Sequence, residues 1–132
     1  MRHPERILLV EDNDQNRELF EFLLEEAGYE IVSAPDAISA REAFTTELPD
    51  LVLMDMSLPG IHGLDLVREI RSLPGGSDVP VIAVTALAMR GDKEKFLAGG
   101  CDGYIAKPIE PAAFVSEVER FLPPDPSGAR LS

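Results

Sequence analysis

Short apolar runs alternate strictly with helical patterns along most of this chain, and this alternation constrains the possible folds more than any other feature of the sequence. Each run has the length of a buried strand, and the segment after it repeats apolar residues at intervals typical of an amphipathic helix. Phe20, Leu23, Leu24 and Ala27 show this spacing, and Gly28 then marks a helix end. Strands are expected at residues 7–10, 31–32, 51–54, 81–84 and 104–106, with helical patterns over 20–27, 37–44, 66–73, 89–98 and 114–122.

Five strand–helix units in succession predict an α/β fold with a parallel sheet covered by helices on both faces. Right-handed crossovers leave few topologies, and we expect a doubly wound sheet of strand order 2-1-3-4-5. One domain over residues 1–122 accounts for nearly all of the 132 residues. The sequence after residue 122 is rich in proline, which predicts a short flexible tail over residues 123–132.

The composition argues against several classes of protein. Twenty-four acidic and twelve basic side chains give a net charge of -12, which repels a phosphate backbone and predicts no nucleic-acid binding by this chain alone. No apolar run approaches the roughly 18 residues of a membrane-spanning helix, and no secretory signal precedes the first strand, so a cytoplasmic protein without membrane contact is expected. A single cysteine, Cys101, excludes an internal disulfide and a cysteine-rich metal site.

Polar side chains stand directly after four of the five predicted strands. Glu11 and Asp12 follow the first, Asp55 the third, Thr85 the fourth and Lys107 the fifth. Because the carboxyl ends of parallel strands meet at one edge of the sheet, we expect these side chains to converge there. Three neighbouring carboxylates repel one another, and a hard divalent cation such as Mg²⁺ removes that cost while it keeps room for phosphate oxygens.

This set of residues predicts phosphoryl transfer. Asp55 lies on the central strand and is best placed as the nucleophile, because carboxylates form acyl phosphates in known enzymes. Lys107 would neutralise one phosphoryl oxygen, and Thr85 would donate a hydrogen bond to another. Taken singly, each of these residues is more simply explained as a turn or helix-capping residue, so the prediction depends on their combination at one sheet edge.

The chain resembles the receiver domain of two-component response regulators over about residues 5–122. The matching segments are residues 8–13, 50–60, 81–86 and 102–108, in this order and spacing. Residues 89–104 are most similar to stand-alone receivers of the cell-division type and to receivers attached to hybrid kinases. The resemblance implies a flavodoxin-like fold and a place in a phosphorelay.

The resemblance also implies roles for the residues at the strand ends. Asp55 would accept a phosphoryl group from a phosphohistidine on a histidine kinase or a histidine phosphotransfer protein. Glu11, Asp12, Asp55 and the backbone carbonyl of Ser57 would bind Mg²⁺.

Three further residues take part in the activation that the resemblance implies. Thr85 and Lys107 would contact the phosphoryl group, and Tyr104 would act as a switch that turns inward as Thr85 moves. The bond between Lys107 and Pro108 is expected to be cis. The surface from the fourth to the fifth helix would then present a changed face to a downstream effector protein.

A few positions differ from the common pattern of these receivers. His62 stands where an acid is frequent, and no role is assigned to it. Ser57 and Leu87 occupy positions that tune self-dephosphorylation, and Leu87 offers no hydrogen bond to an attacking water, so a long-lived phosphoryl state is expected. Cys101 is interpreted as a small packing residue.

The leading hypothesis is a single-domain response regulator, expected to be a monomer, that signals through protein–protein contacts and is not an enzyme acting on other substrates. Its first alternative is the receiver portion of a hybrid histidine kinase. A magnesium-dependent hydrolase with an aspartyl-phosphate intermediate would need a second acid near the nucleophile and a covering cap. A flavin carrier would need a phosphate-binding loop after the first strand, where Glu11 and Asp12 would repel the phosphate.

Overall fold

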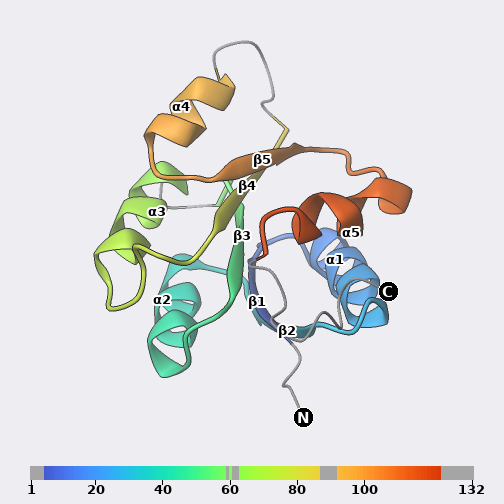
Figure 1. Ribbon diagram of the computed structural model, residues 1–132, viewed down its shortest axis with the longest axis horizontal. Coiled ribbons are helices and arrows are strands. Elements are labelled where there is room, and N and C mark those ends of the chain that lie inside the picture. The colour runs from blue at the N-terminus through green and yellow to red at the C-terminus, as the bar shows by residue number, and fades with distance from the viewer. Residues whose placement is uncertain (1–4, 59, 61–62, 87–91, 123–132) are drawn as a thin grey trace.

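The five predicted strands form one parallel sheet in the order β2-β1-β3-β4-β5, which confirms the doubly wound α/β class (Figure 1). The computed structural model describes residues 5–58, 60, 63–86 and 92–122. The strands are β1 (Arg6–Val10), β2 (Glu30–Ala34), β3 (Leu51–Asp55), β4 (Val81–Thr85) and β5 (Gly103–Ala106). The helices are α1 (Asp14–Glu26), α2 (Ala37–Thr46), α3 (Gly63–Ser72), α4 (Asp92–Ala98) and α5 (Pro111–Glu119).

The sheet separates two apolar cores. Helices α1 and α5 cover one face, while α2, α3 and α4 lie on the other (Figure 1). Within β1, Ile7 and Leu9 pack with α1 and α5, whereas Leu8 and Val10 pack with the opposite helices. Because successive side chains of a strand point to opposite faces and both faces are covered, each central strand must be apolar throughout. The continuous apolar runs in the sequence have this cause.

Local signals fix the ends of several helices. Asn13 caps α1, because its side chain accepts a hydrogen bond from the backbone N–H of Asn16 at 2.9 Å. Asp36 caps α2 in the same way through Ser39. Pro111 is the first residue of α5, as the sequence predicted. The bond between Lys107 and Pro108 is cis, as expected.

The structure differs from the prediction mainly at the borders of its elements. Strand β2 runs from Glu30 to Ala34 and is longer than predicted, because it is an edge strand whose first four residues are not fully buried and lack a continuous apolar signal. The tail predicted over residues 123–132, the expectations for His62 and Leu87, and the first residues of the predicted fourth helix lie outside the described residues.

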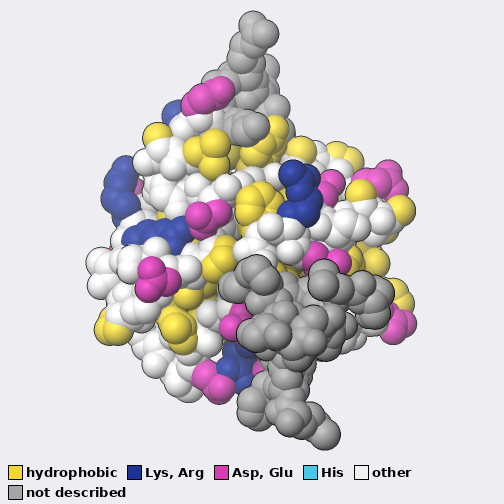
Figure 2. Space-filling view, in the orientation of Figure 1, with side chains coloured by type: hydrophobic (Ala, Val, Ile, Leu, Met, Phe, Trp, Pro, Cys, Tyr) yellow, Lys and Arg dark blue, Asp and Glu magenta, His cyan; other side chains and the backbone are white. Residues whose placement is uncertain are grey.

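The charges on the surface and the lengths of the helices agree with a sequence that is acidic and contains no long apolar run. Figure 2 shows acidic side chains spread over the face in view, among hydrophobic and basic ones. Within the part of the chain that the structure describes, no helix has the length and apolar character needed to cross a membrane.

Candidate functional site

The carboxyl-end edge of the sheet brings the predicted site residues to one place. Strands β1 and β3 pair directly, with Val10 opposite Met54, so the residues that follow, Glu11 and Asp55, become neighbours. On the other side of β3, Thr85 ends β4, and its backbone carbonyl accepts a hydrogen bond from the Lys107 N–H at 2.8 Å. Side chains from four strands therefore share one edge, as the sequence predicted.

Three carboxylates form the centre of this site. Glu11, Asp12 and Asp55 each offer one oxygen, and these oxygens all lie within 4.8 Å of one another. The residues Glu11 and Asp55 are only 1% and 2% exposed, whereas Asp12 is exposed. Such a cluster of oxygen donors could hold a hard divalent cation.

Glu11 is the carboxyl group whose titration this environment changes most clearly. Burial, followed by hydrogen bonding to the Asp55 carboxyl, raises the pKa of Glu11 to about 7, against an ordinary value of 4.5. The nearby ammonium of Lys107 acts in the opposite direction but does not cancel these effects. This raised pKa favours the protonated form of Glu11 in the metal-free protein, and bringing another positive charge to the cluster would favour its ionised form.

Lys107 supplies the cation of the site. Its Nζ lies 3.2 Å from Glu11 Oε1 and 3.4 Å from Asp55 Oδ1. The lysine side chain is 18% exposed, so it reaches the buried acids from the protein surface. One ammonium thus faces two carboxylates, and the cluster keeps excess negative charge even before Asp12 is counted.

Backbone groups hold the two buried acids in place. The N–H of Ser57 donates to Asp55 Oδ1 at 2.9 Å, and the N–H of Asn13 donates to Glu11 Oε2 at 3.2 Å. Each bond spans two residues, so the turn after each strand fixes the carboxylate that precedes it. Ser57 therefore contacts the Asp55 carboxylate through its N–H.

Sequence reasoning missed one supporting residue of this site. The Nη1 of Arg17 donates to the backbone carbonyl of Glu11 at 3.1 Å, while its Nη2 pairs with Asp14 on the same helix. The spacing of Asp14 and Arg17 by three residues is a visible signal, but it reads as an ordinary surface ion pair.

Thr85 and Tyr104 lie on neighbouring strands. Thr85 is fully buried at the end of β4, and Tyr104 is half-buried on β5, opposite Ala83. The Tyr104 ring packs partly against the core beneath α2, α3 and α4. It also lines a groove of about 460 Å³ between β5, α4 and α5, together with Leu97 and Phe121.

Comparison with known proteins agrees with this arrangement. The family model for the response regulator receiver domain matches residues 7–119. The polar-differentiation response regulator DivK of Brucella anthropi is 39% identical over 119 residues, which cover 90% of this chain and 97% of that protein. This similarity extends over nearly the whole of both chains.

Solved structures show the same fold. A putative response regulator from Chloroflexus aurantiacus has a TM-score of 0.83 at 33% identity, covering 89% of this chain and 97% of that one. The receiver domain of a Pseudomonas aeruginosa sensor histidine kinase, solved with a magnesium ion coordinated in its active site cleft, has a TM-score of 0.81 at 38% identity over the same shares of the two chains. The chain therefore belongs to the response regulator receiver domain family.

Proposed function

We propose that this chain is a single-domain response regulator that accepts a phosphoryl group on Asp55 from a phosphohistidine donor, in a reaction that requires Mg²⁺. The observation that carries the proposal is the position of Asp55, whose carboxylate lies within 3.4 Å of the Lys107 ammonium and beside two further carboxylates at the sheet edge. The family consists of signalling domains, which agrees with this function.

The site residues suit Mg²⁺ in the chemistry of their donors. All the side-chain ligands are carboxylate oxygens, and among the described residues the buried Glu11 Oε1 has no hydrogen bond, its contact being the ion pair with Lys107 Nζ. Glu11, Asp12, Asp55 and the Ser57 carbonyl would hold the ion, which would supply positive charge to the phosphoryl oxygens during transfer.

The protein's own groups account for the remaining steps. An oxygen of the Asp55 carboxylate attacks the phosphorus atom while the bond from phosphorus to the donor's imidazole nitrogen breaks, and that nitrogen leaves with the electron pair. Lys107 then neutralises one phosphoryl oxygen, and Thr85 donates its hydroxyl hydrogen to another. In this proposal Thr85 moves toward the phosphoryl group to make this hydrogen bond, and its movement draws Tyr104 inward. The turn of Tyr104 changes the groove beside α4 and α5 that an effector protein would contact.

A phosphoramidate test examines the chemistry without any partner protein. Phosphoramidate carries a phosphorus–nitrogen bond like that of phosphohistidine, so with Mg²⁺ the protein should gain the mass of one phosphoryl group. Asp55→Asn should gain none, whereas Asp65→Asn, which removes an exposed acid of α3, should behave like the wild type. A phosphoryl group retained by the Asp55 variant, or full transfer in excess chelator, contradicts the proposal.

A small apolar groove beside the acceptor supports a protein donor. It measures about 310 Å³ and is lined by Asn16, Leu19, Phe20, Ala86, Lys107, Pro108 and Ile109. Leu19 is 38% exposed, and Phe22, one helical turn away, is 60% exposed. Because Asp55 itself is almost fully buried, a protein donor should need to dock against this groove to bring its phosphohistidine to the carboxylate, whereas a small donor such as phosphoramidate needs no docking.

A charge placed in the groove tests this docking. Leu19→Glu should slow phosphoryl transfer from a phosphorylated histidine phosphotransfer protein by about tenfold or more, since an apolar contact would be replaced by a charge. The rate with phosphoramidate should stay unchanged. Ile38→Glu, at a residue of α2 that is 66% exposed, is the matched control. Equal transfer rates for the two variants would exclude this docking surface.

A further inference from the structure

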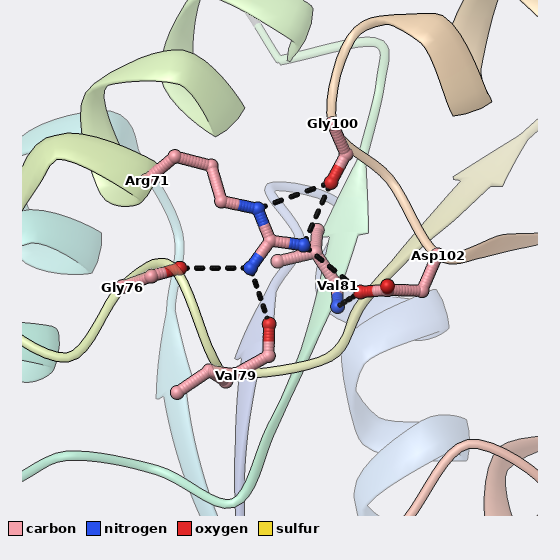
Figure 3. Close-up of polar contacts among 6 residues, drawn as sticks. All are labelled: Arg71, Gly76, Val79, Val81, Gly100 and Asp102. Carbon is pink, nitrogen blue, oxygen red and sulfur yellow. Dashed lines mark hydrogen bonds and ion pairs between the residues drawn. The ribbon is translucent and has the colours of Figure 1, made fainter.

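Arg71, the ninth residue of α3, uses all of its side-chain donors at the edge of the sheet opposite the acidic site (Figure 3). Its Nη1 donates to the carbonyl oxygens of Gly76 at 2.7 Å and Val79 at 2.5 Å. The Gly100 carbonyl accepts from Nε at 3.1 Å and from Nη2 at 2.7 Å. Nη2 also pairs with Asp102 Oδ2 at 2.9 Å. A guanidinium has five N–H donors, so every one of them is bound.

Asp102 extends this network into the sheet. Its Oδ2 also accepts from the Val81 N–H at 2.8 Å, and its own N–H donates to the Val81 carbonyl at 2.7 Å. Val81 is the first residue of β4, and Asp102 immediately precedes β5. Arg71, Asp102 and the groups that they bind, the Arg71 clamp, thus tie α3 to the amino ends of two neighbouring strands.

The clamp also holds the end of α4. Gly100 has a φ of +111° and donates to the Leu97 carbonyl, while the Cys101 N–H donates to the Phe96 carbonyl at 3.0 Å. These two bonds and the left-handed glycine are the Schellman motif that terminates a helix. The carbonyl of this same Gly100 accepts two of the five Arg71 bonds, so the helix end cannot move without breaking them.

The body of α4 is attached much more weakly. Among residues 94–98, only the Phe96 side chain is buried, whereas α3 buries five of its residues. Helices with few buried apolar contacts are the elements that open or shift most easily. Among the described residues, Thr85 thus stands at the acidic site, α4 is weakly held by its side chains, and Gly100 is strongly held at the end of that helix.

We propose that the Arg71 clamp is the fixed point of the switch: a change that begins at Thr85 displaces α4 about Gly100 and stops there. This inference rests on the proposed function, because the change begins when Asp55 is modified. Fixed amino ends also keep β4 and β5 aligned, so that Thr85 and Lys107 stay together at the other ends of these strands.

The clamp requires the shape of arginine as well as its charge. Lysine has a compact ammonium on a flexible stem and cannot reach four acceptors in the fixed planar arrangement that arginine provides. Arg71→Lys should therefore release the α4 end while it keeps a positive charge near Asp102. Arg68→Lys, on the same helix, changes an arginine that is 70% exposed and pairs with Asp65, and it serves as the matched control.

Amide hydrogen exchange of the full chain, with and without beryllium trifluoride and Mg²⁺, tests the proposal. In the wild type, this phosphoryl mimic should change exchange in α4 and leave the amides of Val81 and residues 100–102 unchanged. In Arg71→Lys, exchange at these clamp amides should be about tenfold faster without the mimic, and the change on adding it should extend through them. Arg68→Lys should match the wild type.

Three results overturn the inference. Clamp amides that respond in the wild type as strongly as α4 does would show that the end is not fixed. An Arg71→Lys variant with wild-type exchange would show that arginine does not fix it. If phosphoramidate adds no phosphoryl mass to the wild type, the proposed function fails and this inference fails with it; a wild type that gains the phosphoryl mass but whose clamp amides respond to the mimic as α4 does refutes the inference alone.

Discussion

Lys107 and Glu11 form an ion pair in which Nζ and Oε1 are 3.2 Å apart and the acid is almost completely buried. The two residues follow the carboxyl ends of strands that are not neighbours, since β3 and β4 lie between β1 and β5. The lysine side chain therefore reaches across the sheet edge to an acid on the far side of Asp55.

Lys107→Ala should change the titration of Glu11. Burial and the neighbouring Asp55 raise the pKa of Glu11 to about 7, and the lysine charge opposes this rise, so its removal should move the pKa higher still. NMR titration of the side-chain carboxyl carbons in the metal-free protein measures the shift. Lys95→Ala, at an exposed position of α4, should leave the Glu11 pKa unchanged. A Glu11 pKa that stays the same in Lys107→Ala would contradict the charge coupling.

The metal-free protein should lose stability as the pH rises through the Glu11 titration. The folded chain holds this proton up to a pKa of about 7, whereas the unfolded chain releases it near 4.5, so the stabilisation present at low pH disappears between these values. One pKa unit corresponds to about 1.4 kcal/mol, so the whole effect is at most about 3–4 kcal/mol. Urea unfolding in chelator at about pH 5 and about pH 8 measures it.

Glu11→Gln isolates this contribution from that of other titrating groups. The glutamine variant cannot ionise, so its free energy of unfolding should fall less than that of the wild type over the same pH interval. Parallel pH profiles for the two proteins would mean that Glu11 has an ordinary pKa in the fold.

Magnesium should stabilise the protein, and more strongly at high pH than at low pH. A cation that binds only the folded state at ten times its Kd adds about 1.4 kcal/mol. At low pH the ion must first displace the Glu11 proton, so the gain shrinks. Thermal unfolding with and without Mg²⁺ measures the gain, which Asp12→Asn should reduce and Asp65→Asn should not. Equal gains for these two variants would exclude Asp12 from the metal site.

The contact between α1 and α5 should be a major source of stability. The rings of Phe20 and Phe114 stack with their centroids 5.1 Å apart, and each residue is only 1% exposed. Phe114→Ala should lower the free energy of unfolding by about 3–5 kcal/mol, because it removes a buried ring and leaves a cavity. Phe22→Ala, at a ring that is 60% exposed, should change it by about 0.5 kcal/mol or less. Denaturant unfolding distinguishes the two outcomes.

The central strands and the acidic edge could be predicted from sequence because their physical causes are local. Strands β1, β3 and β4 are buried on both faces, so each leaves an uninterrupted apolar run. Glu11, Asp55 and Lys107 stand at the ends of such runs, and parallel pairing alone brings these ends together. The edge strand β2 gave a weaker signal, because Glu30 and Ser33 are not buried.

The Arg71 clamp could not be predicted in this way. An arginine near the end of an amphipathic helix reads as a surface charge that favours the helix dipole. Its carbonyl acceptors leave no trace in the side-chain pattern, since a backbone oxygen is available at every position. The glycines at 75, 76, 99 and 100 predict turns, but they do not indicate that two of these turns share one guanidinium.

The division of the interior by the sheet has a consequence for engineering. Among the residues that the structure describes, the packing cluster of α1 and α5 shares no buried residue with that of α2, α3 and α4. A substitution at a buried residue of one cluster therefore changes the packing of that cluster directly and acts on the other through the strands between them. If donors dock on α1 as proposed, donor preference could be redesigned on the outer surface of α1 without changing a buried residue in the cluster of α2, α3 and α4.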